Sequence, residues 1–253
     1  PDEGPQGIDC SAALVTFSNE NLNFTASQLD HLVACTSKWE PNVVRVIISD
    51  SEGHQRGTAV VIRKFHRHYR ELHTELCGIP MRFVDTQSYS FHKLRNDSYW
   101  KTNVTDRAVI GDPSNADESK RKASEVPFAA LPRMRKLRKK LTRFGEIAGI
   151  DLTDMTADVC FFGTASPGKE APSNPTGINP TTSKGKKIVA LNSGSHILFR
   201  LCAFDGIQPI GPITEIKLRR GDLIILDKDA SGLSNFGKHV KHWTSAGRND
   251  QVF

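Results

Sequence analysis

The sequence predicts an α+β fold in which a β-sandwich or jelly roll is flanked by helices. Four short segments that favour β-strands follow one another closely near the C-terminal end, and a strongly amphipathic helix precedes them. Of the 253 residues, 38% are hydrophobic and 25% are charged, which is ordinary for a globular protein with a substantial core. No stretch approaches the roughly 18 apolar residues that a membrane-spanning helix needs, so we expect no membrane partner.

The first half of the chain predicts a mixture of strands and helices. Residues 1–10 are polar and contain proline and glycine, so we expect a flexible terminus. Thr25 and Gln28 have the spacing of a capping box, which predicts that a helix begins there. The other expected elements are a strand at Ala12–Phe17, a hairpin of Val43–Ile48 with Thr58–Ile62, a helix at His66–Leu76, and a long polar loop at Asp97–Glu125.

The second half of the chain opens with the clearest helix, Leu131–Phe144. Its apolar residues recur at spacings of three and four, and Pro132 stands where a first turn tolerates proline. The strands expected after it are Val159–Gly163, Lys187–Asn192, His196–Phe204, Thr214–Leu218 and Asp222–Asp227. We therefore expect one domain over residues 11–253, with an N-terminal α/β part at 11–125 and a jelly-roll core at 126–253.

Several short strings in the second half occur in a recognisable order. Leu131 and Pro132 precede a basic helix, residues 188–195 read Ile-Val-Ala-Leu-Asn-Ser-Gly-Ser before Phe199-Arg200, and residues 219–226 read Arg-Arg-Gly-Asp-Leu-Ile-Ile-Leu. In this order, residues 126–253 resemble the AlkB-like family of Fe(II)- and 2-oxoglutarate-dependent dioxygenases. The resemblance implies a double-stranded β-helix, the form of jelly roll found in that family, and a nucleic-acid base as substrate.

The residues that the resemblance assigns to iron binding are mostly absent. The family holds iron with a His-x-Asp pair and a distal histidine. The pair should fall at Gly177 and Asn179, but glycine offers no ligand, a neutral amide binds Fe(II) poorly, and the chain contains no His-x-Asp. His239 stands where the distal histidine is expected, and Arg248 is the candidate for the arginine that holds 2-oxoglutarate. We therefore expect a degenerate site without cofactors; the alternative is an active dioxygenase with an unorthodox triad, using Fe(II) and 2-oxoglutarate.

Other polar clusters have two interpretations each. His239 and His242 are three residues apart, as a metal pair on a helix would be, or they are surface histidines near a strand end. His66, His68 and His73 lie among arginines and lysines, either as a nucleic-acid contact or as a solvated helix face. His73-Thr74-Glu75 is the one His-x-Glu and is a poor metal candidate inside a helix. Ser195 and His196 are adjacent and would point to opposite faces of a strand, which argues against a catalytic pair.

Positive charge is concentrated in one segment of the chain. Residues 120–143 contain ten basic residues and one acid, a net charge of +9, so that the rest of this +6 chain sums to −3. The basic residues of the predicted helix are Arg133, Arg135, Lys136, Arg138, Lys139, Lys140 and Arg143. A solvated face normally mixes acids with bases, whereas this one repels itself.

A polyanion or an acidic partner protein would relieve this repulsion. Three alternatives remain open: RNA or single-stranded DNA contacted through phosphates, an acidic protein, or no partner. Six neutralised phosphates would give a slope of about −5 in log affinity against log salt. Five scattered cysteines without a CxxC pair favour a reducing, intracellular location. The sequence thus predicts a nucleic-acid-binding, AlkB-like protein that has lost its iron, either a pseudoenzyme or a subunit of a complex.

Overall fold

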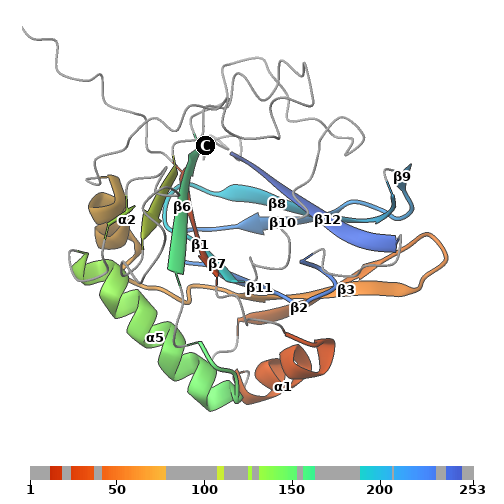
Figure 1. Cartoon of the computed structure of the whole chain (residues 1–253), viewed down its shortest axis with the longest axis horizontal. Coiled ribbons are helices and arrows are strands. Elements are labelled where there is room, and N and C mark those ends of the chain that lie inside the picture. The colour runs from red at the N-terminus through yellow and green to blue at the C-terminus, as the bar shows by residue number, and fades with distance from the viewer. Residues whose placement is uncertain are drawn as a thin grey trace, which may run out of the picture.

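The computed structural model describes residues 12–18, 24–36, 42–77, 107–110, 125–126, 131–152, 156–162, 189–206, 208–231 and 238–246. Within these residues the chain forms two β-sheets and three helices, so the α+β class is confirmed (Figure 1). The helices are α1 (Ala26–Thr36), α2 (Tyr69–Cys77) and α5 (Pro132–Ala148). None of the described helices combines the length and the apolar character needed to cross a membrane.

The larger sheet has eight strands in the order β2-β3-β11-β7-β1-β6-β4-β5. All its neighbouring strands pair antiparallel except β4 and β5, which are parallel. Its strands are β1 (Ala12–Ser18), β2 (Val43–Ser49), β3 (Gln55–Ile62), β4 (Arg107–Ile110), β5 (Glu125–Val126), β6 (Thr156–Phe162), β7 (Val189–Asn192) and β11 (Leu223–Leu226).

The smaller sheet has the strand order β10-β8-β12, with β9 paired to β8. Its strands are β8 (Ile197–Asp205), β9 (Gln208–Pro209), β10 (Thr214–Leu218) and β12 (Lys238–Ala246). Successive strands of the C-terminal half move between the sheets: β7 lies in the larger, β8 and β10 in the smaller, β11 in the larger and β12 in the smaller.

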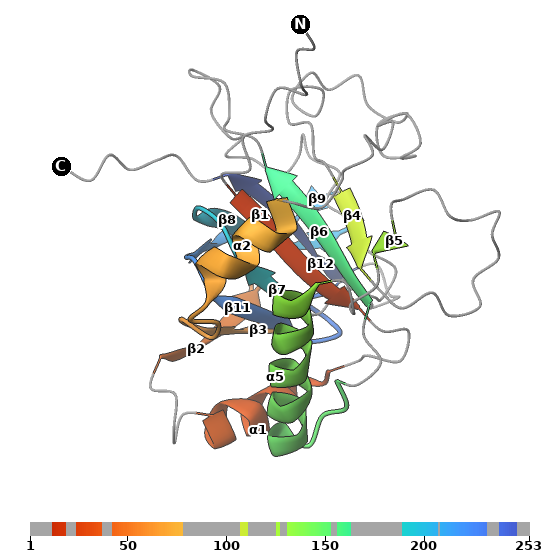
Figure 2. The same ribbon diagram turned by 90° about the vertical axis from the view of Figure 1, so that its left-hand side faces the viewer.

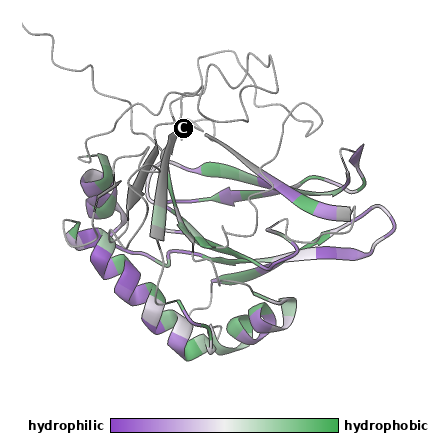
Figure 3. Cartoon of the chain, viewed as in Figure 1, coloured by the Kyte–Doolittle hydropathy of each residue, from purple (hydrophilic) through white to green (hydrophobic). Residues whose placement is uncertain are grey.

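The hydrophobic core is shared by both sheets and the helices. One cluster of buried residues joins Val189 and Ile224 of the larger sheet, Leu201 and Val240 of the smaller one, and Leu137 of α5. Every residue of β7 and β11 is buried, which is expected for strands covered on both faces. Figure 2 shows α5 and α2 in front of the larger sheet, and Figure 3 shows apolar residues along the interior strands and polar ones on the outside of α5.

Most local predictions from the sequence are confirmed. Gln28 and Thr25 form the reciprocal hydrogen bonds of a capping box, at 2.9 and 3.2 Å, where α1 begins. The predicted hairpin is the antiparallel pair β2–β3. Helix α5 runs four residues beyond the predicted Phe144, because its terminator is Gly149 in the left-handed conformation, with φ of 68°.

The expected division of the chain at residue 126 does not match the sheets. Strands β1, β2 and β3 from the first half lie in the same sheet as β6, β7 and β11 from the second. The core is therefore not confined to residues 126–253, because β1 and β3 provide some of its most buried side chains. The expected polar loop at Asp97–Glu125 contains β4 and the first residue of β5, and residues 1–10 lie outside the described part.

Candidate functional site

Helix α5 packs on the body of the protein through its apolar face, as its periodicity predicts. Met134, Leu137 and Leu141 are fully buried. The first turn has no cap of its own, and the carboxylate of Glu75 on α2 replaces one. Its two oxygens accept hydrogen bonds of 2.8 Å from the backbone N–H groups of Arg133 and Met134. A carboxylate at this end also matches the partial positive charge of a helix N-terminus.

The opposite face of α5 carries positive charge that nothing in the described part of the chain neutralises. Arg135, Lys136, Lys139 and Arg143 are exposed, and none of them forms an ion pair with a described residue. We call these four residues the basic face. Three of them, at positions 135, 139 and 143, recur every four residues and so form one row along the helix, with a rise of about 6 Å per step.

The other three cations predicted for this helix have different surroundings. Arg133 and Arg138 are half-buried, and Arg138 has an interaction of its own. The Lys140 ammonium donates a hydrogen bond to the Phe65 carbonyl and lies 4.2 Å from the centre of the Phe65 ring. Lys140 therefore ties α5 to the connection between β3 and α2. Arg133, Arg138 and Lys140 were predicted as part of the same basic surface, but they are not counted in the basic face.

The predicted histidine cluster does not form a single surface. His66 is buried ahead of α2, His68 is exposed, and His73 lies within hydrogen-bond distance of the Ser193 hydroxyl, 3.2 Å away. Burial, followed by the charges of Lys140 and His68, lowers the pKa of His66 to about 4. His66 is therefore a neutral core residue at physiological pH, and the interpretation of the three histidines as one contact patch is wrong.

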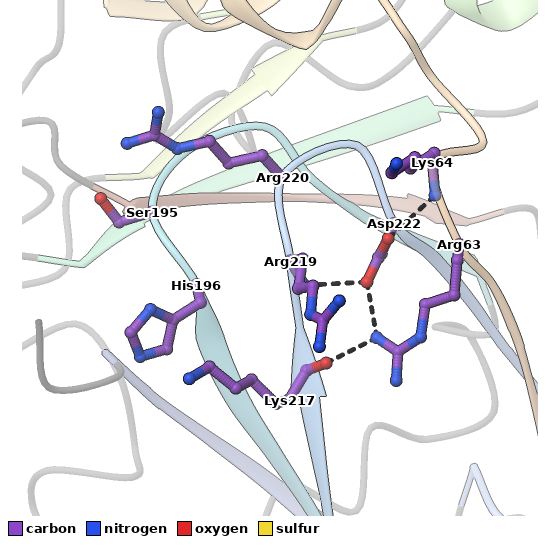
Figure 4. Close-up of a pocket in the computed structure, with 8 residues that line it drawn as sticks. All are labelled: Arg63, Lys64, Ser195, His196, Lys217, Arg219, Arg220 and Asp222. Atoms are coloured by element: carbon purple, nitrogen blue, oxygen red, sulfur yellow. Dashed lines mark hydrogen bonds and ion pairs between the residues drawn. The ribbon is translucent and has the colours of Figure 1, made fainter. Parts of the chain in front are cut away.

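A second concentration of positive charge lines a pocket of about 380 Å³ near one end of the sheets (Figure 4). Three segments far apart in the sequence form it: the end of β3, the β7–β8 turn and the β10–β11 turn. We call it the basic pocket. Its lining residues are Arg63, Lys64, Ser195, His196, Lys217, Arg219, Arg220 and Asp222. Five cations against one carboxylate leave a net charge of +4 with His196 neutral.

Asp222 is the internal counter-ion of this pocket and also organises two of its walls. Its side chain is 1% exposed, and its carboxylate accepts a bond of 2.6 Å from the Arg63 guanidinium. It also accepts backbone N–H bonds of 2.9 Å from Lys64 and from Arg219. Arg63 in turn donates to the Lys217 carbonyl at 2.6 Å. The strand end that carries Arg63 and Lys64 is thereby fixed against the β10–β11 turn, as the dashed lines in Figure 4 show.

Asn192 fixes the third wall. This fully buried residue ends β7, and its side-chain amide donates to the carbonyls of Ser195 at 2.8 Å and Leu218 at 2.9 Å. Its backbone carbonyl accepts from Gly221 at 2.7 Å, and its backbone N–H donates to Asp222 at 3.1 Å. The side chain and the backbone of Asn192 therefore hold the β7–β8 turn and the β10–β11 turn together.

The sequence did not predict this pocket as a unit. Arg219 and Arg220 belong to one of the strings that carry the resemblance, and Arg63 lies near the predicted histidine cluster. The sequence did not bring these residues together, because Arg63 and Asp222 are 159 positions apart. Ser195 and His196 precede β8, which begins at Ile197, so the expectation that they occupy opposite faces of a strand is wrong. Both line the basic pocket instead.

The iron site expected from the resemblance is only partly within the described residues. Gly177, Asn179 and Arg248 lie outside them. His239 and His242 lie on β12, where a spacing of three places them on opposite faces, so they cannot form a metal pair. The His242 ring stacks on Phe199, with ring centres 5.5 Å apart. If Gly177 and Asn179 stand at the positions of the His-x-Asp pair, as the resemblance implies, then one half-buried imidazole, a glycine and an amide would not make a donor set that fits Fe(II).

Two other groups of possible ligands have structural explanations. Glu75, the acid of the His-x-Glu pair, caps α5. Asp50, Glu52 and His54 are the one described group whose ligand atoms converge, within 4.8 Å of one another, but Arg56 already pairs with Asp50 at 2.6 Å. Although burial alone would raise it, the hydrogen bonds from Arg56 and from the backbone of His54 and Glu52 lower the pKa of Asp50 to about 2.

Comparison with known proteins does not assign the chain to a family. No protein-family model, no curated protein and no solved structure matches the chain. The features of the structure that bear on function are the basic face and the basic pocket.

Proposed function

We propose that this protein binds RNA or single-stranded DNA through the phosphates, using the basic face of α5. The observation that carries the proposal is the set of four exposed cations, Arg135, Lys136, Lys139 and Arg143, which have no acidic partner in the described structure. Like charges in a row destabilise a helix, and the phosphates of a polyanion relieve that repulsion.

The basic face is suited to phosphates and not to base recognition. Its side chains are long, flexible and solvated, three of them follow one row of the helix, and no rigid donor pair is aimed at a groove edge. Contacts of this kind are independent of sequence and are screened by salt. The rigid mounting of α5, through Leu137, Leu141 and the Glu75 cap, favours the same interpretation, because it holds the four charges on one face of a fixed helix.

The scaffold that carries this helix is, in our proposal, a jelly roll descended from an AlkB-like dioxygenase. The alternation of β7, β8, β10, β11 and β12 between two sheets is compatible with a double-stranded β-helix. The proposal includes the loss of iron, because glycine and asparagine stand at the positions of the His-x-Asp pair. Metal analysis of the purified protein should find no stoichiometric iron, and 2-oxoglutarate should not be turned over to succinate. About one iron per chain, dependent on His239, would instead support an active dioxygenase.

Fluorescence anisotropy with a labelled 20-nucleotide RNA and a DNA strand of the same sequence tests the binding. The protein should bind both at 50 mM salt. A variant with all four residues of the basic face changed to Glu should lose this binding, while its unfolding free energy should stay nearly the same, because exposed charges contribute little to stability.

A charge-preserving variant is the matched control. Exchanging each Arg for Lys and each Lys for Arg in the basic face should leave affinity within about twofold, since point charges suffice for phosphate contact. Binding by the four-Glu variant equal to that of the parent, or no binding by the parent at 50 mM salt, would refute the proposal. An acidic protein partner would then be the better explanation of the basic face.

A further inference from the structure

The basic pocket is separate from the basic face in both construction and shape. The basic face is a convex row on one helix, whereas the pocket is concave and is assembled from three segments of the two sheets. We propose that this pocket binds a phosphate monoester, as a free mononucleotide or as the terminal phosphate of a strand held by α5. The second source alone rests on the proposed function; the pocket itself does not.

The charge balance of the pocket calls for an anion with more than one negative charge. The Asp222 carboxylate already binds Arg63 and two backbone N–H groups, so among the described residues it does not act as a counter-ion for the side chains of Lys64, Arg219 and Arg220. Within the described residues, the side chains of Lys64, Arg219 and Arg220 make no ion pair and no hydrogen bond. Cations held together in a concave site raise each other's energy, and a dianion relieves this more than a carboxylate with a single charge.

The types of donor in the pocket match phosphate oxygens. Arg219 and Arg220 offer planar guanidinium groups that can bind two oxygens at once, and Lys64 and Lys217 offer ammonium groups. Ser195 adds a hydroxyl on the opposite wall. Figure 4 shows Arg220 and Lys217 extending away from Asp222, so their charged ends are not directed at the carboxylate that neutralises Arg63.

The backbone around these donors is held in a fixed and partly strained form. Lys64 has a φ of 55°, a left-handed conformation that is unfavourable for a lysine, and its N–H is bound to Asp222. Gly221, between Arg220 and Asp222, has a φ of 78°, and a Cβ there would collide with the His66 carbonyl. With Asn192 tying the other wall, the donors are pre-organised, which reduces the ordering cost of binding.

The size of the pocket indicates what is attached to the phosphate. At about 380 Å³ it is much larger than a bare phosphate needs and lies at the lower end of the range of small-molecule sites. A mononucleotide or the end of a strand is of that size. We therefore expect uridine 5′-monophosphate to bind more tightly than inorganic phosphate, and uridine without phosphate not to bind.

Isothermal titration with uridine 5′-monophosphate, inorganic phosphate and uridine tests the pocket directly. The parent should bind one uridine 5′-monophosphate per chain. Arg219→Gln with Arg220→Gln should weaken this binding about tenfold or more, since each charged hydrogen bond to phosphate contributes strongly. Lys64→Gln is a second variant, which leaves both turns of the pocket unchanged and should also weaken the binding of uridine 5′-monophosphate. The matched control is Lys136→Gln with Lys139→Gln on α5, which removes two positive charges, as the double arginine variant does. It should leave the affinity for uridine 5′-monophosphate within about twofold of the parent.

Two further titrations identify the source of the phosphate and separate this proposal from the previous one. A 12-nucleotide RNA with a 5′-phosphate should bind the parent more tightly than one with a 5′-hydroxyl if the pocket holds strand ends. It should bind no better if the pocket serves free nucleotides. The proposal is overturned if uridine 5′-monophosphate does not bind, or if the pocket and α5 variants weaken it equally. Loss of RNA binding alone, with uridine 5′-monophosphate still bound, would contradict only the proposed function of α5.

Discussion

Acidification should destabilise this protein through one buried imidazole. His66 is 7% exposed, and its Nε2 atom has no hydrogen-bond partner in the described structure. Its pKa is about 4 in the native protein against 6.5 for an ordinary histidine, because burial and then the charges of Lys140 and His68 oppose protonation, with Glu71 acting weakly the other way. At pH values between 4 and 6.5 this histidine is protonated in the unfolded chain but mostly neutral in the native protein. Its contribution to stability is therefore fully present above pH 6.5 and is lost as the pH falls toward 4.

The magnitude follows from the two pKa values. Between pH 7.5 and pH 5 the free energy of unfolding should fall by no more than about 2 kcal/mol. With a urea m-value of about 2 kcal/mol per molar, the unfolding midpoint should fall by about 1 M. The lowered pKa of Asp50, about 2, acts below this window. Burial raises the pKa of Asp227, which opposes the fall, but Asp227 is the same in every variant compared.

Urea unfolding of three proteins at pH 7.5 and pH 5 isolates the contribution of His66. His66→Leu removes the titrating group and should lose most of the pH dependence seen in the parent. His68→Gln removes an exposed histidine, with a side chain 70% exposed, and should keep most of the pH dependence, because burial is the largest cause of the lowered His66 pKa and the charge of His68 is a smaller one. The reasoning is refuted if His66→Leu and the parent lose the same stability over this range.

Three further predictions concern the mounting of α5. Leu137→Ala, at a fully buried site, should lower the free energy of unfolding in urea by about 2 to 5 kcal/mol, and Leu137→Asp should lower it further. Ile147→Ala is the control on the same helix. Its side chain is 50% exposed, so the free energy of unfolding should change by less than about 0.5 kcal/mol. Glu75→Ala should cost about 1 to 2 kcal/mol by removing the cap of α5, and equal stability would contradict that role. Gly145→Ala should cost about 1 to 3 kcal/mol, because its new Cβ would lie 2.8 Å from Leu152 Cγ; a stabilised variant would show that the helix end can move.

The elements that the sequence predicted well are those specified by local chemistry. The capping box at Thr25, the β2–β3 hairpin and the buried row of α5 each depend on residues within a few positions of one another. The same holds for the exposure of Arg135, Lys136 and Lys139, since a helix has two sides and the apolar residues occupy one.

The features that the sequence did not predict arise from contacts between distant segments. Strand β4 lies in what reads as a polar loop, and pairing with β6 makes it a strand. Glu75 caps a helix 58 positions away, and Lys140 of α5 donates a hydrogen bond to the carbonyl of Phe65, 75 positions away. The basic pocket unites three segments through Asn192 and Asp222, and nothing in the local pattern of either residue indicates that role.

The salt dependence of RNA binding tests the central claim most directly. The structure leaves four cations of α5 exposed and without described partners, two fewer than the six phosphate contacts considered from the sequence. For a single strand, four neutralised phosphates predict a slope of about −3 in log affinity against log salt between 50 and 200 mM. Exchange of Lys for Arg within the basic face should preserve that slope, and removal of one of its charges should reduce it by about 0.7. A slope near zero in the parent, or a slope that does not change when charges of the basic face are removed, would contradict phosphate binding by α5.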